Sequence, residues 1–423
     1  MEQDHFVRSG YDVSYTQSPN TKPIYILLMT YMRGGSSFLG EMFNQNPKVF
    51  YWFEPLAETF KKIMGMIDSR NWFLHDDLSL RWFSPRKKKT IFKLLSSIFS
   101  CKIDALPEYV LKHNFATNMF WNKSLSLNSY RECLEAKPNV TCRSFGQESH
   151  NPSVGRLKRI LCSKDRHFGI RPRNIDLELS NTGLHRELKS LLDKLFHQRS
   201  SLYYTDDHLS RKLLPLENSS KDIQPYRGYL NTKVRRCSAN ILTVCKQRPI
   251  HVIKTVRMRM DLVLQLLNAI PELKVVYEWR NPLGILNSRW SSSKYHRISN
   301  FTLDTDILCK QMNFDLVTSD RLKAKFPNSM TVIKYEDLAD NTIGSVSGLY
   351  GDLGIGSIPD SIFSWIVDNT KAETTSGPLS TKKNATAVVR QWKSQLDKTI
   401  INYIKDKCRD VLKLMNYDDE LLL

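Results

Sequence analysis

The feature that most constrains the fold is a short apolar run followed by a glycine turn and an amphipathic segment. Residues 23–29 read PIYILLM, which is typical of a buried strand. Residues 36–46 carry apolar side chains at helical spacing, with Ser36 or Ser37 at the N-cap position. A second apolar run, VFYWFE, follows at 49–54. Strand, loop, helix and strand in this order predict the beginning of a βαβ unit.

The alternation of strands and helices returns after residue 250. Apolar runs at 250–256, 273–280 and 330–335 predict strands. The pattern also predicts a helix over 260–270, a long one within 305–326, and one continuous apolar helical face between Trp392 and Met415. Strands that alternate with helices indicate an α/β fold, with a central, mostly parallel sheet flanked by helices.

Most of the chain is expected to form a single domain. Its 423 residues suffice for a sizeable core without metal or disulfide support. In chain order we expect a polar lead-in (1–22), the domain (23–417) and a tail (418–423). Within the domain, two α/β halves (23–56 and 250–417) would enclose a large helical and loop-rich insertion (57–249).

The loop Arg33-Gly34-Gly35-Ser36-Ser37 offers the groups that bind an oxyanion. A loop between a strand and a helix presents backbone N–H groups at the positive end of the helix dipole. Glycine lets the backbone approach the anion closely, serine adds hydroxyl donors, and arginine adds a forked positive charge. The loop lacks the Walker A pattern and its lysine. It predicts a phosphate or sulfate cradle, with a glycine turn, a serine cap and a surface arginine as the alternative.

The net charge favours an anionic ligand. Lys and Arg number 62 against 43 Asp and Glu, which gives a formal charge of +19. Such a surplus attracts nucleic acid, acidic phospholipid, acidic polysaccharide or a highly charged cofactor, and charge alone does not choose among them. A hydrophobic fraction of 41% with 25% charged residues excludes a disordered chain, a collagen-like fibre and a multi-span membrane protein.

Two segments resemble a known family. TYMRGGSSFLGEMFNQNPKVFYWFEPL (30–56) resembles the 5′-phosphosulfate-binding region of Golgi carbohydrate sulfotransferases, most nearly the galactose/N-acetylglucosamine/N-acetylgalactosamine 6-O-sulfotransferase group. That group carries Arg-Ser-Gly-Ser-Ser, so Gly34 stands where the family has Ser. YEWRNPLGILNSRW (277–290) resembles the 3′-phosphate motif, with Arg280 and Ser288 eight residues apart. The resemblance implies a P-loop-like sulfotransferase fold and 3′-phosphoadenylyl sulfate (PAPS) as donor.

The resemblance also implies which residues hold the donor. They would be those of the two motifs: Arg33, Gly34, Gly35, Ser36, Ser37, Phe38, Leu39, Arg280, Asn281, Pro282, Leu283, Gly284, Ile285, Leu286, Asn287 and Ser288. A late basic loop resembles the family stretch that closes over the nucleotide, which makes Lys382, Lys383 and Arg390 candidate phosphate contacts.

Other charged residues have two interpretations. Lys254 and Arg257 either line the donor or acceptor cleft or are solvated charges. We expect Tyr335, Glu336 and Asp337 to be structural, at a strand end and a helix cap.

The implied reaction is in-line sulfuryl transfer to a sugar hydroxyl, 6-O by resemblance, in which the protein positions groups and stabilises charge. Arg33 would stabilise the leaving phosphate. Glu54 is the candidate base, with a pKa raised by partial desolvation, and its alternative role is a helix N-cap or a salt bridge to a neighbouring Lys. His251 is a weaker candidate at the far edge of the sheet. This chemistry requires no metal.

The expected partner is a glycan or glycosaminoglycan acceptor. A protein tyrosine or a small molecule is an alternative acceptor for the same reaction. Three other classes remain as alternatives: a kinase or P-loop NTPase, a basic heparin- or nucleic-acid-binding protein without turnover, and a relative that binds the donor without turnover. The run RKKK at 86–89 and the net charge support the basic polyanion-binding protein, but no nucleic-acid motif is present.

The even number of cysteines and the N-glycosylation sequons favour a secretory compartment. None of the eight cysteines forms CxxC, which argues against zinc. They could form the local disulfides Cys133–Cys142 and Cys237–Cys245, or remain as buried thiols. Glycosylation sequons lie at Asn122, Asn139, Asn218, Asn300 and Asn384.

The expected location depends on the family resemblance, which implies the Golgi lumen. The longest apolar run has six residues, far fewer than the ~20 that span a bilayer. The polar N-terminus lacks a signal-peptide core. Two expectations follow: a cytosolic protein, or a Golgi protein whose N-terminal anchor is missing from this sequence.

Overall fold

The fold is built on a parallel sheet. The computed structural model describes residues 22–64, 73–75, 77–117, 124–135, 224–291, 300–370 and 384–417. Its strands are β1 (Ile24–Met29), β2 (Val49–Phe53), β3 (Ile250–Thr255), β4 (Leu273–Trp279) and β5 (Met330–Lys334). They form one five-stranded sheet in the order β2-β3-β1-β4-β5, with every pair parallel. The predicted α/β fold is confirmed.

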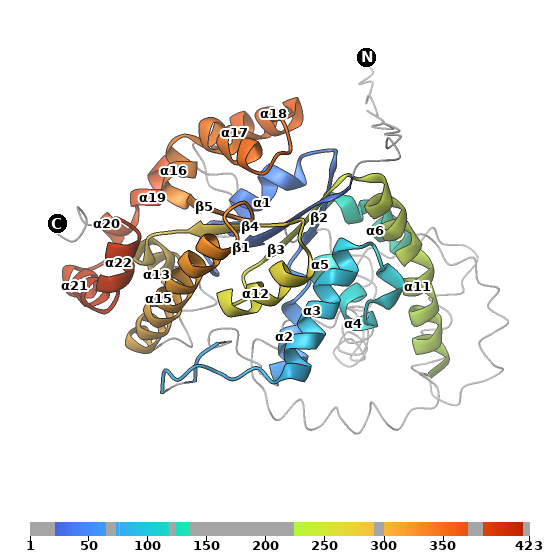
Figure 1. The fold of residues 1–423 in the computed structure, drawn as a ribbon, viewed down its shortest axis with the longest axis horizontal. Helices are drawn as coiled ribbons and strands as arrows, with labels where there is room; N and C mark the ends of the chain where they lie inside the picture. Colours follow the sequence, from blue (N-terminus) through green and yellow to red (C-terminus); the bar gives the residue numbers. More distant parts are fainter. Residues whose placement is uncertain are drawn as a thin grey trace, which may run out of the picture.

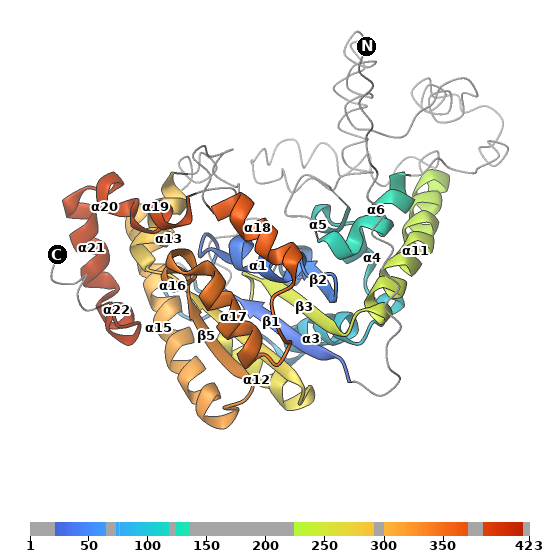
Figure 2. The same cartoon turned by 90° about the horizontal axis from the view of Figure 1, so that it is seen from above.

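Helices flank both faces of this sheet (Figures 1 and 2). Their bounds are α1 (Ser36–Asn44), α2 (Ala57–Met64), α3 (Pro85–Phe99), α4 (Glu108–Leu111), α5 (Asn114–Thr117), α6 (Asn128–Glu135), α11 (Gln224–Gln247), α12 (Met260–Ala269), α13 (Pro282–Trp290), α15 (Phe301–Lys325), α16 (Tyr335–Asp340), α17 (Thr342–Asp352), α18 (Asp360–Thr370), α19 (Ala385–Arg390), α20 (Trp392–Gln395), α21 (Lys398–Lys407) and α22 (Arg409–Leu414).

Alternation along the strands sends side chains into two separate cores. Leu27 of β1 points into the core formed with α3, α12 and α15. Its neighbours Ile26 and Leu28 point into the core formed with α1, α16, α17 and α18. Figure 1 shows these two groups of helices on opposite sides of the sheet. Because both faces are covered, the strands read as near-continuous apolar runs.

The C-terminal segment differs from the single helical face predicted between Trp392 and Met415. It is divided into α20, α21 and α22. The side chain of Asp397 accepts a hydrogen bond from the backbone N–H of Thr399 at 2.7 Å and so begins a new helix. The apolar spacing is real, since Ile404, Cys408 and Met415 are buried, but the N-cap interrupts the helix.

Three disulfides join elements that are distant in sequence: Cys101–Cys245, Cys133–Cys237 and Cys309–Cys408. The predicted local pairings Cys133–Cys142 and Cys237–Cys245 are therefore wrong. Cys133 pairs with Cys237, 104 positions away, and Cys245 pairs with Cys101, 144 positions away. Buried thiols are excluded for these six residues. Cys142 and Cys162 lie outside the described residues.

The sequons are only partly within the described chain. The Asn300 side chain accepts from the N–H of Leu303, and that of Asn384 accepts from the N–H of Ala387, so each caps a helix. Asn122, Asn139 and Asn218 lie outside the described residues. Within the part that is described, no helix combines the length and apolar character needed to cross a membrane.

Removing the Cys309–Cys408 disulfide should destabilise the fold. The bridge ties α15 to the C-terminal helices across a separation of 99 residues, and closing such a loop restricts the unfolded chain. We expect the double variant Cys309→Ala/Cys408→Ala to lose about 2–5 kcal/mol in free energy of unfolding, measured by denaturant titration without reductant. Equal midpoints for variant and wild type under these conditions would contradict the bridge.

Candidate active site

The two family-like motifs meet at the carboxyl edge of the sheet. The loop with Arg33 follows β1, and Arg280 follows the adjacent strand β4. The Arg33 Nε donates to the Ser288 Oγ at 3.0 Å, and the Arg280 Nη1 donates to the Arg33 carbonyl oxygen at 2.9 Å. Residues that are about 250 positions apart in sequence therefore form one cluster. Ligands of open α/β sheets bind at this edge.

The loop after β1 has a left-handed conformation at two positions, Arg33 (φ 69°) and Gly35 (φ 105°). A Cβ atom on Gly35 would overlap the Tyr335 ring and lie 3.0 Å from the Glu278 Oε1, so only glycine fits here. Within the described structure, the backbone N–H groups of Gly35 and Ser36 have no hydrogen-bond acceptor. They lie at the N-terminus of the nine-residue helix α1, an arrangement suited to an anion.

The turn after β4 holds the Arg280 guanidinium in a fixed place. The Asn281 Oδ1 accepts from the N–H of Leu283 at 2.9 Å and caps α13. A Cβ atom on Gly284 would lie 3.0 Å from the Arg280 Nε, so this glycine makes room for the guanidinium. The guanidinium carbon lies 4.4 Å from the centroid of the Tyr335 ring, in a cation–π contact.

Glu336 also supports this turn. Its Oε1 accepts from the N–H of Asn281 at 3.0 Å, and its other oxygen accepts from the Tyr417 hydroxyl. The C-terminal end of the described chain thus contacts the loop that carries Arg280.

Several other expected site residues place their side chains elsewhere. The apolar members are buried among core side chains, which leaves only their backbone for a ligand: Phe38, Leu39, Leu283, Ile285 and Leu286. Pro282 begins α13, and the Asn287 Nδ2 donates to the Gln395 Oε1 at 2.9 Å.

The late basic loop is described only in part. Arg390 forms a bidentate ion pair with Asp340, with nitrogen–oxygen distances of 3.1 and 3.4 Å. The Arg390 side chain is 56% exposed. Lys382 and Lys383 lie outside the described residues.

Glu54 ends β2 as a buried ion-pair partner, 2% exposed. Its Oε1 accepts from the Lys254 Nζ at 2.8 Å and from the N–H of Val256 at 2.9 Å, and its Oε2 accepts from the Arg257 Nη1 at 2.6 Å. Burial alone would raise the pKa of Glu54, but the two cations outweigh it and lower the pKa below its ordinary value. The predicted raised pKa is therefore wrong.

Lys254 and Arg257 are not solvated surface charges. Both side chains are buried and face Glu54 beneath the carboxyl edge of the sheet. Glu54 thus forms ion pairs with one residue of β3 and one residue of the turn after β3. Both lie about 200 positions after Glu54 in the sequence.

Glu278 is a residue of this region that the sequence analysis missed. It lies on β4, fully buried, and neither carboxyl oxygen has a hydrogen-bond partner among the described residues. Burial raises the pKa of Glu278 to about 8. The sequence did contain a signal for this residue: it is an acidic residue within the otherwise largely apolar predicted strand 273–280, where a buried side chain is expected.

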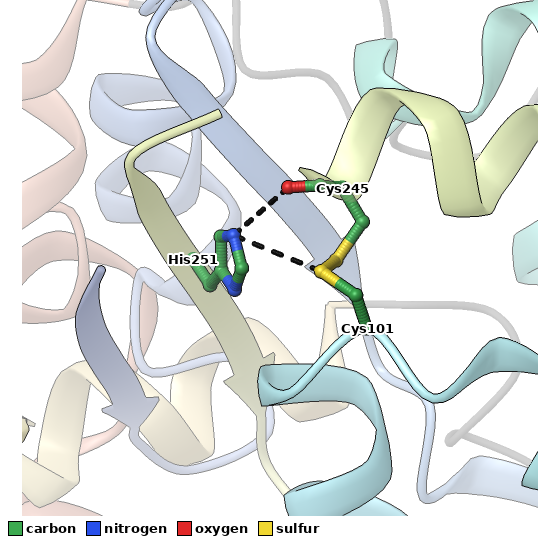
Figure 3. Close-up of side chains that lie close together, drawn as sticks. All are labelled: Cys101, Cys245 and His251. Carbon is green, nitrogen blue, oxygen red and sulfur yellow. Dashed lines mark hydrogen bonds between the residues drawn. A yellow bond between two sulfur atoms is a disulfide. The ribbon is translucent and has the colours of Figure 1, made fainter. Parts of the chain in front are cut away.

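His251 lies at the opposite edge of the sheet, where it pairs with Tyr25 at the beginning of β1. Figure 3 shows its ring beside the Cys101–Cys245 disulfide. Its Nδ1 lies 2.6 Å from the Phe99 carbonyl oxygen, and burial lowers its pKa. These contacts exclude His251 as the base. The cluster of His251 with two cysteines offers no thiolate to a metal, because both sulfur atoms are in the disulfide.

Glu54→Gln should destabilise the fold in a pH-dependent way. The variant removes the carboxylate that pairs with the buried Lys254 and Arg257, so we expect a loss of about 3–5 kcal/mol at pH 7. Because the pKa of Glu54 is lower in the folded protein than the value of about 4.3 in the unfolded chain, its ionised carboxylate stabilises the fold above that pH. This stabilisation is lost as the pH falls through the lower pKa of the folded protein. The difference between wild type and variant, measured by denaturant titration, should therefore shrink below about pH 4.

The matched control is Glu58→Gln in the first turn of α2, expected to change stability by less than about 1 kcal/mol. A Glu54→Gln protein as stable as wild type at pH 7 would contradict the buried ion pairs.

Comparisons with known proteins agree with this geometry. Residues 238–416 match the family model described as a sulfotransferase domain. Carbohydrate sulfotransferase 1 from Homo sapiens is 23% identical over 94% of this chain and 80% of its own. Carbohydrate sulfotransferase 5 from Mus musculus is 22% identical over 93% and 80%, and carbohydrate sulfotransferase 3 from Homo sapiens is 22% identical over 93% and 67%. Residues 238–416 are therefore similar to a sulfotransferase domain, and most of the chain is similar, as the resemblance implied, to carbohydrate sulfotransferases.

Proposed function

We propose that this protein transfers a sulfuryl group from PAPS to a sugar hydroxyl, 6-O by resemblance, of a glycan or glycosaminoglycan. The observation that carries the proposal is the contact between the two phosphate-site motifs, in which Arg33 reaches Ser288 and Arg280 reaches the Arg33 carbonyl. The names of the relatives support a carbohydrate acceptor.

In this proposal the donor spans the two motifs. Its 5′-phosphosulfate lies on the loop 33–37, where the N–H groups of Gly35 and Ser36 can donate to it. Its 3′-phosphate is bound by Arg280 and Ser288. The Arg280 guanidinium has five N–H donors and uses one on the Arg33 carbonyl, and the Ser288 hydroxyl accepts from Arg33 while its own hydrogen remains to donate.

Arg33 is the proposed cation for the leaving group. When the bond between sulfur and the bridging oxygen breaks, negative charge develops on the phosphate that leaves. A guanidinium held by Ser288 at the mouth of the loop can stabilise that charge without reorganising.

Glu54 is the proposed base. Its lowered pKa keeps the carboxylate ionised at neutral pH, ready to accept a hydrogen bond from the sugar hydroxyl. A carboxylate has about four acceptor positions, and Lys254, Val256 and Arg257 occupy three, which leaves one on the Oε2. A weak base suffices if bond formation lags behind bond cleavage, as in a loose, phosphoryl-like transition state. The proton then moves to Glu54 late in the reaction.

The charge and the disulfides fit this assignment. A net charge of +19 attracts both an anionic donor and an acidic polysaccharide acceptor. The disulfides Cys101–Cys245, Cys133–Cys237 and Cys309–Cys408 form and persist in an oxidising lumen, and we propose a Golgi location.

The first test is transfer of radiolabelled sulfate from PAPS to a panel of desulfated glycans. We expect incorporation into one glycan class, and Arg33→Ala should lower the rate by about 10²-fold or more because it removes the charge at the leaving phosphate. Arg409→Ala, which removes an exposed arginine paired with Asp406, is the control and should leave transfer unchanged. Bound PAPS without transfer to any glycan would overturn the carbohydrate acceptor, and failure to bind PAPS would overturn both phosphate sites.

The role of Glu54 needs a variant that keeps the negative charge. Glu54→Asp preserves a counter-charge for Lys254 and Arg257 but withdraws the carboxylate by one methylene. We expect kcat to fall by about 10²-fold, with the dissociation constant of the donor unchanged within about threefold. Donor binding is measured by calorimetry on the same preparations. A parallel loss of binding and kcat would indicate a structural role only.

A further inference from the structure

Glu278 lies directly against the loop that the proposed function gives to the phosphosulfate. A Cβ atom built on Gly35 would lie 3.0 Å from the Glu278 Oε1, so the carboxyl faces the loop backbone at its left-handed glycine. The neighbouring strand β1 ends at Met29, opposite Tyr277. Thr30 therefore follows β1 beside Glu278 on β4. The carboxyl is part of the floor beneath the anion cradle.

No group among the described residues satisfies this carboxyl. Both oxygens are buried without a hydrogen-bond partner, and the Thr30 hydroxyl lies close enough to lower the pKa without a hydrogen bond of normal geometry. The two carboxyl groups near the sheet edge thus have opposite environments. Glu54 accepts three hydrogen bonds, and Glu278 accepts none of normal geometry from the described residues.

The charged and titratable groups around Glu278 come from every neighbouring element. They are Lys254 of β3, Arg280 after β4, Tyr335 and Glu336 of α16, and Tyr51 of β2. Lys254 is committed to Glu54 at 2.8 Å, and Arg280 donates to the Arg33 carbonyl and packs over Tyr335. Neither cation forms an ion pair with Glu278 within the described structure. Burial therefore dominates and favours the neutral acid.

We propose that Glu278 is a proton-linked positioning residue of the donor site, a neutral carboxyl in the donor complex that takes up a proton from solvent when the donor binds. This inference rests on the proposed function, because it needs an anion on the loop 33–37. An ionised Glu278 beneath the cradle would repel that anion through a water-poor region, where charges interact strongly. A neutral carboxyl removes the repulsion and supplies one O–H donor. Ketosteroid isomerase uses a neutral buried Asp as such a donor.

The linkage has a definite sign. In the free protein the pKa of Glu278 is about 8, so about half of the molecules carry the ionised form at pH 8. A bound polyanion favours the protonated form and raises this pKa further. Donor affinity should thus be constant below about pH 7 and fall by up to about tenfold per pH unit above pH 8.

The experiment measures proton uptake on binding of adenosine 3′,5′-bisphosphate by isothermal titration calorimetry. Titrations at pH 8 in buffers of different ionisation enthalpy give the number of protons taken up. The phosphates of the ligand, with a second pKa of about 6, are already ionised there and contribute little. We expect about half a proton per site for wild type and about none for Glu278→Gln. At pH 9 the variant should bind about tenfold more tightly than wild type.

The matched control is Glu41→Gln. Glu41 is also a buried glutamate with a pKa raised by burial, but it lies further along α1, where Asn44 and Gln45 donate to it. This variant should show wild-type proton uptake. Far-UV circular dichroism and thermal melts establish that each variant is folded. If Glu278→Gln does not fold, the uptake by wild type and by Glu41→Gln decides the question.

Two results would overturn the inference while leaving the proposed function intact. One is tight binding by wild type without proton uptake between pH 7.5 and 9, the window set by a pKa of about 8. The other is equal uptake by wild type and a folded Glu278→Gln protein. If folded wild type binds the nucleotide at no pH, the proposed function fails, and the inference fails with it.

Discussion

The hydrogen bond from Arg280 to the Arg33 carbonyl is the contact on which the site depends. It joins the loop after β1 to the turn after β4, two adjacent strands whose sequences are about 250 residues apart. In the proposed donor site, the side chain assigned to the 3′-phosphate thereby also fixes the backbone assigned to the 5′-phosphosulfate. Tyr335 completes the arrangement, because its ring packs against Arg280 and occupies the space beside Gly35. We therefore expect a change at any of these residues to affect both halves of the proposed donor site.

The local features of the fold could be predicted from the sequence, and the pairings could not. The strand, glycine loop and helix at 23–46 carry their own signals: an apolar run, two adjacent glycines and a helical period. The loop and Arg280 each follow an apolar run that predicts a strand, and a parallel sheet brings the carboxyl ends of its strands to one edge. The partners of Glu54 and Cys133 depend on which strands and helices become neighbours, which a single sequence does not encode locally.

The errors share a physical cause. A raised pKa for Glu54 follows from burial alone, and the structure adds Lys254 and Arg257, which reverse it. Glu278 escaped notice because one acidic residue within an apolar strand resembles an edge position, while its strand β4 lies between β1 and β5 and its side chain is fully buried. Two glutamates at one sheet edge thus have opposite protonation preferences. Such divergence is how one site can hold both a proton acceptor and a neutral acid.

The disulfide between α6 and α11 has a consequence for how proteins of this kind can change. Cys133 and Cys237 have Cα atoms 5.6 Å apart, although 104 residues separate them in the chain. The disulfide thus holds α6 beside α11, the helix that β3 follows. Chain length between these two cysteines can grow, shrink or be exchanged by recombination while the distance between the flanking helices stays fixed. A change in that number of residues is therefore compatible with the same spacing of α6 and α11 beside the sheet.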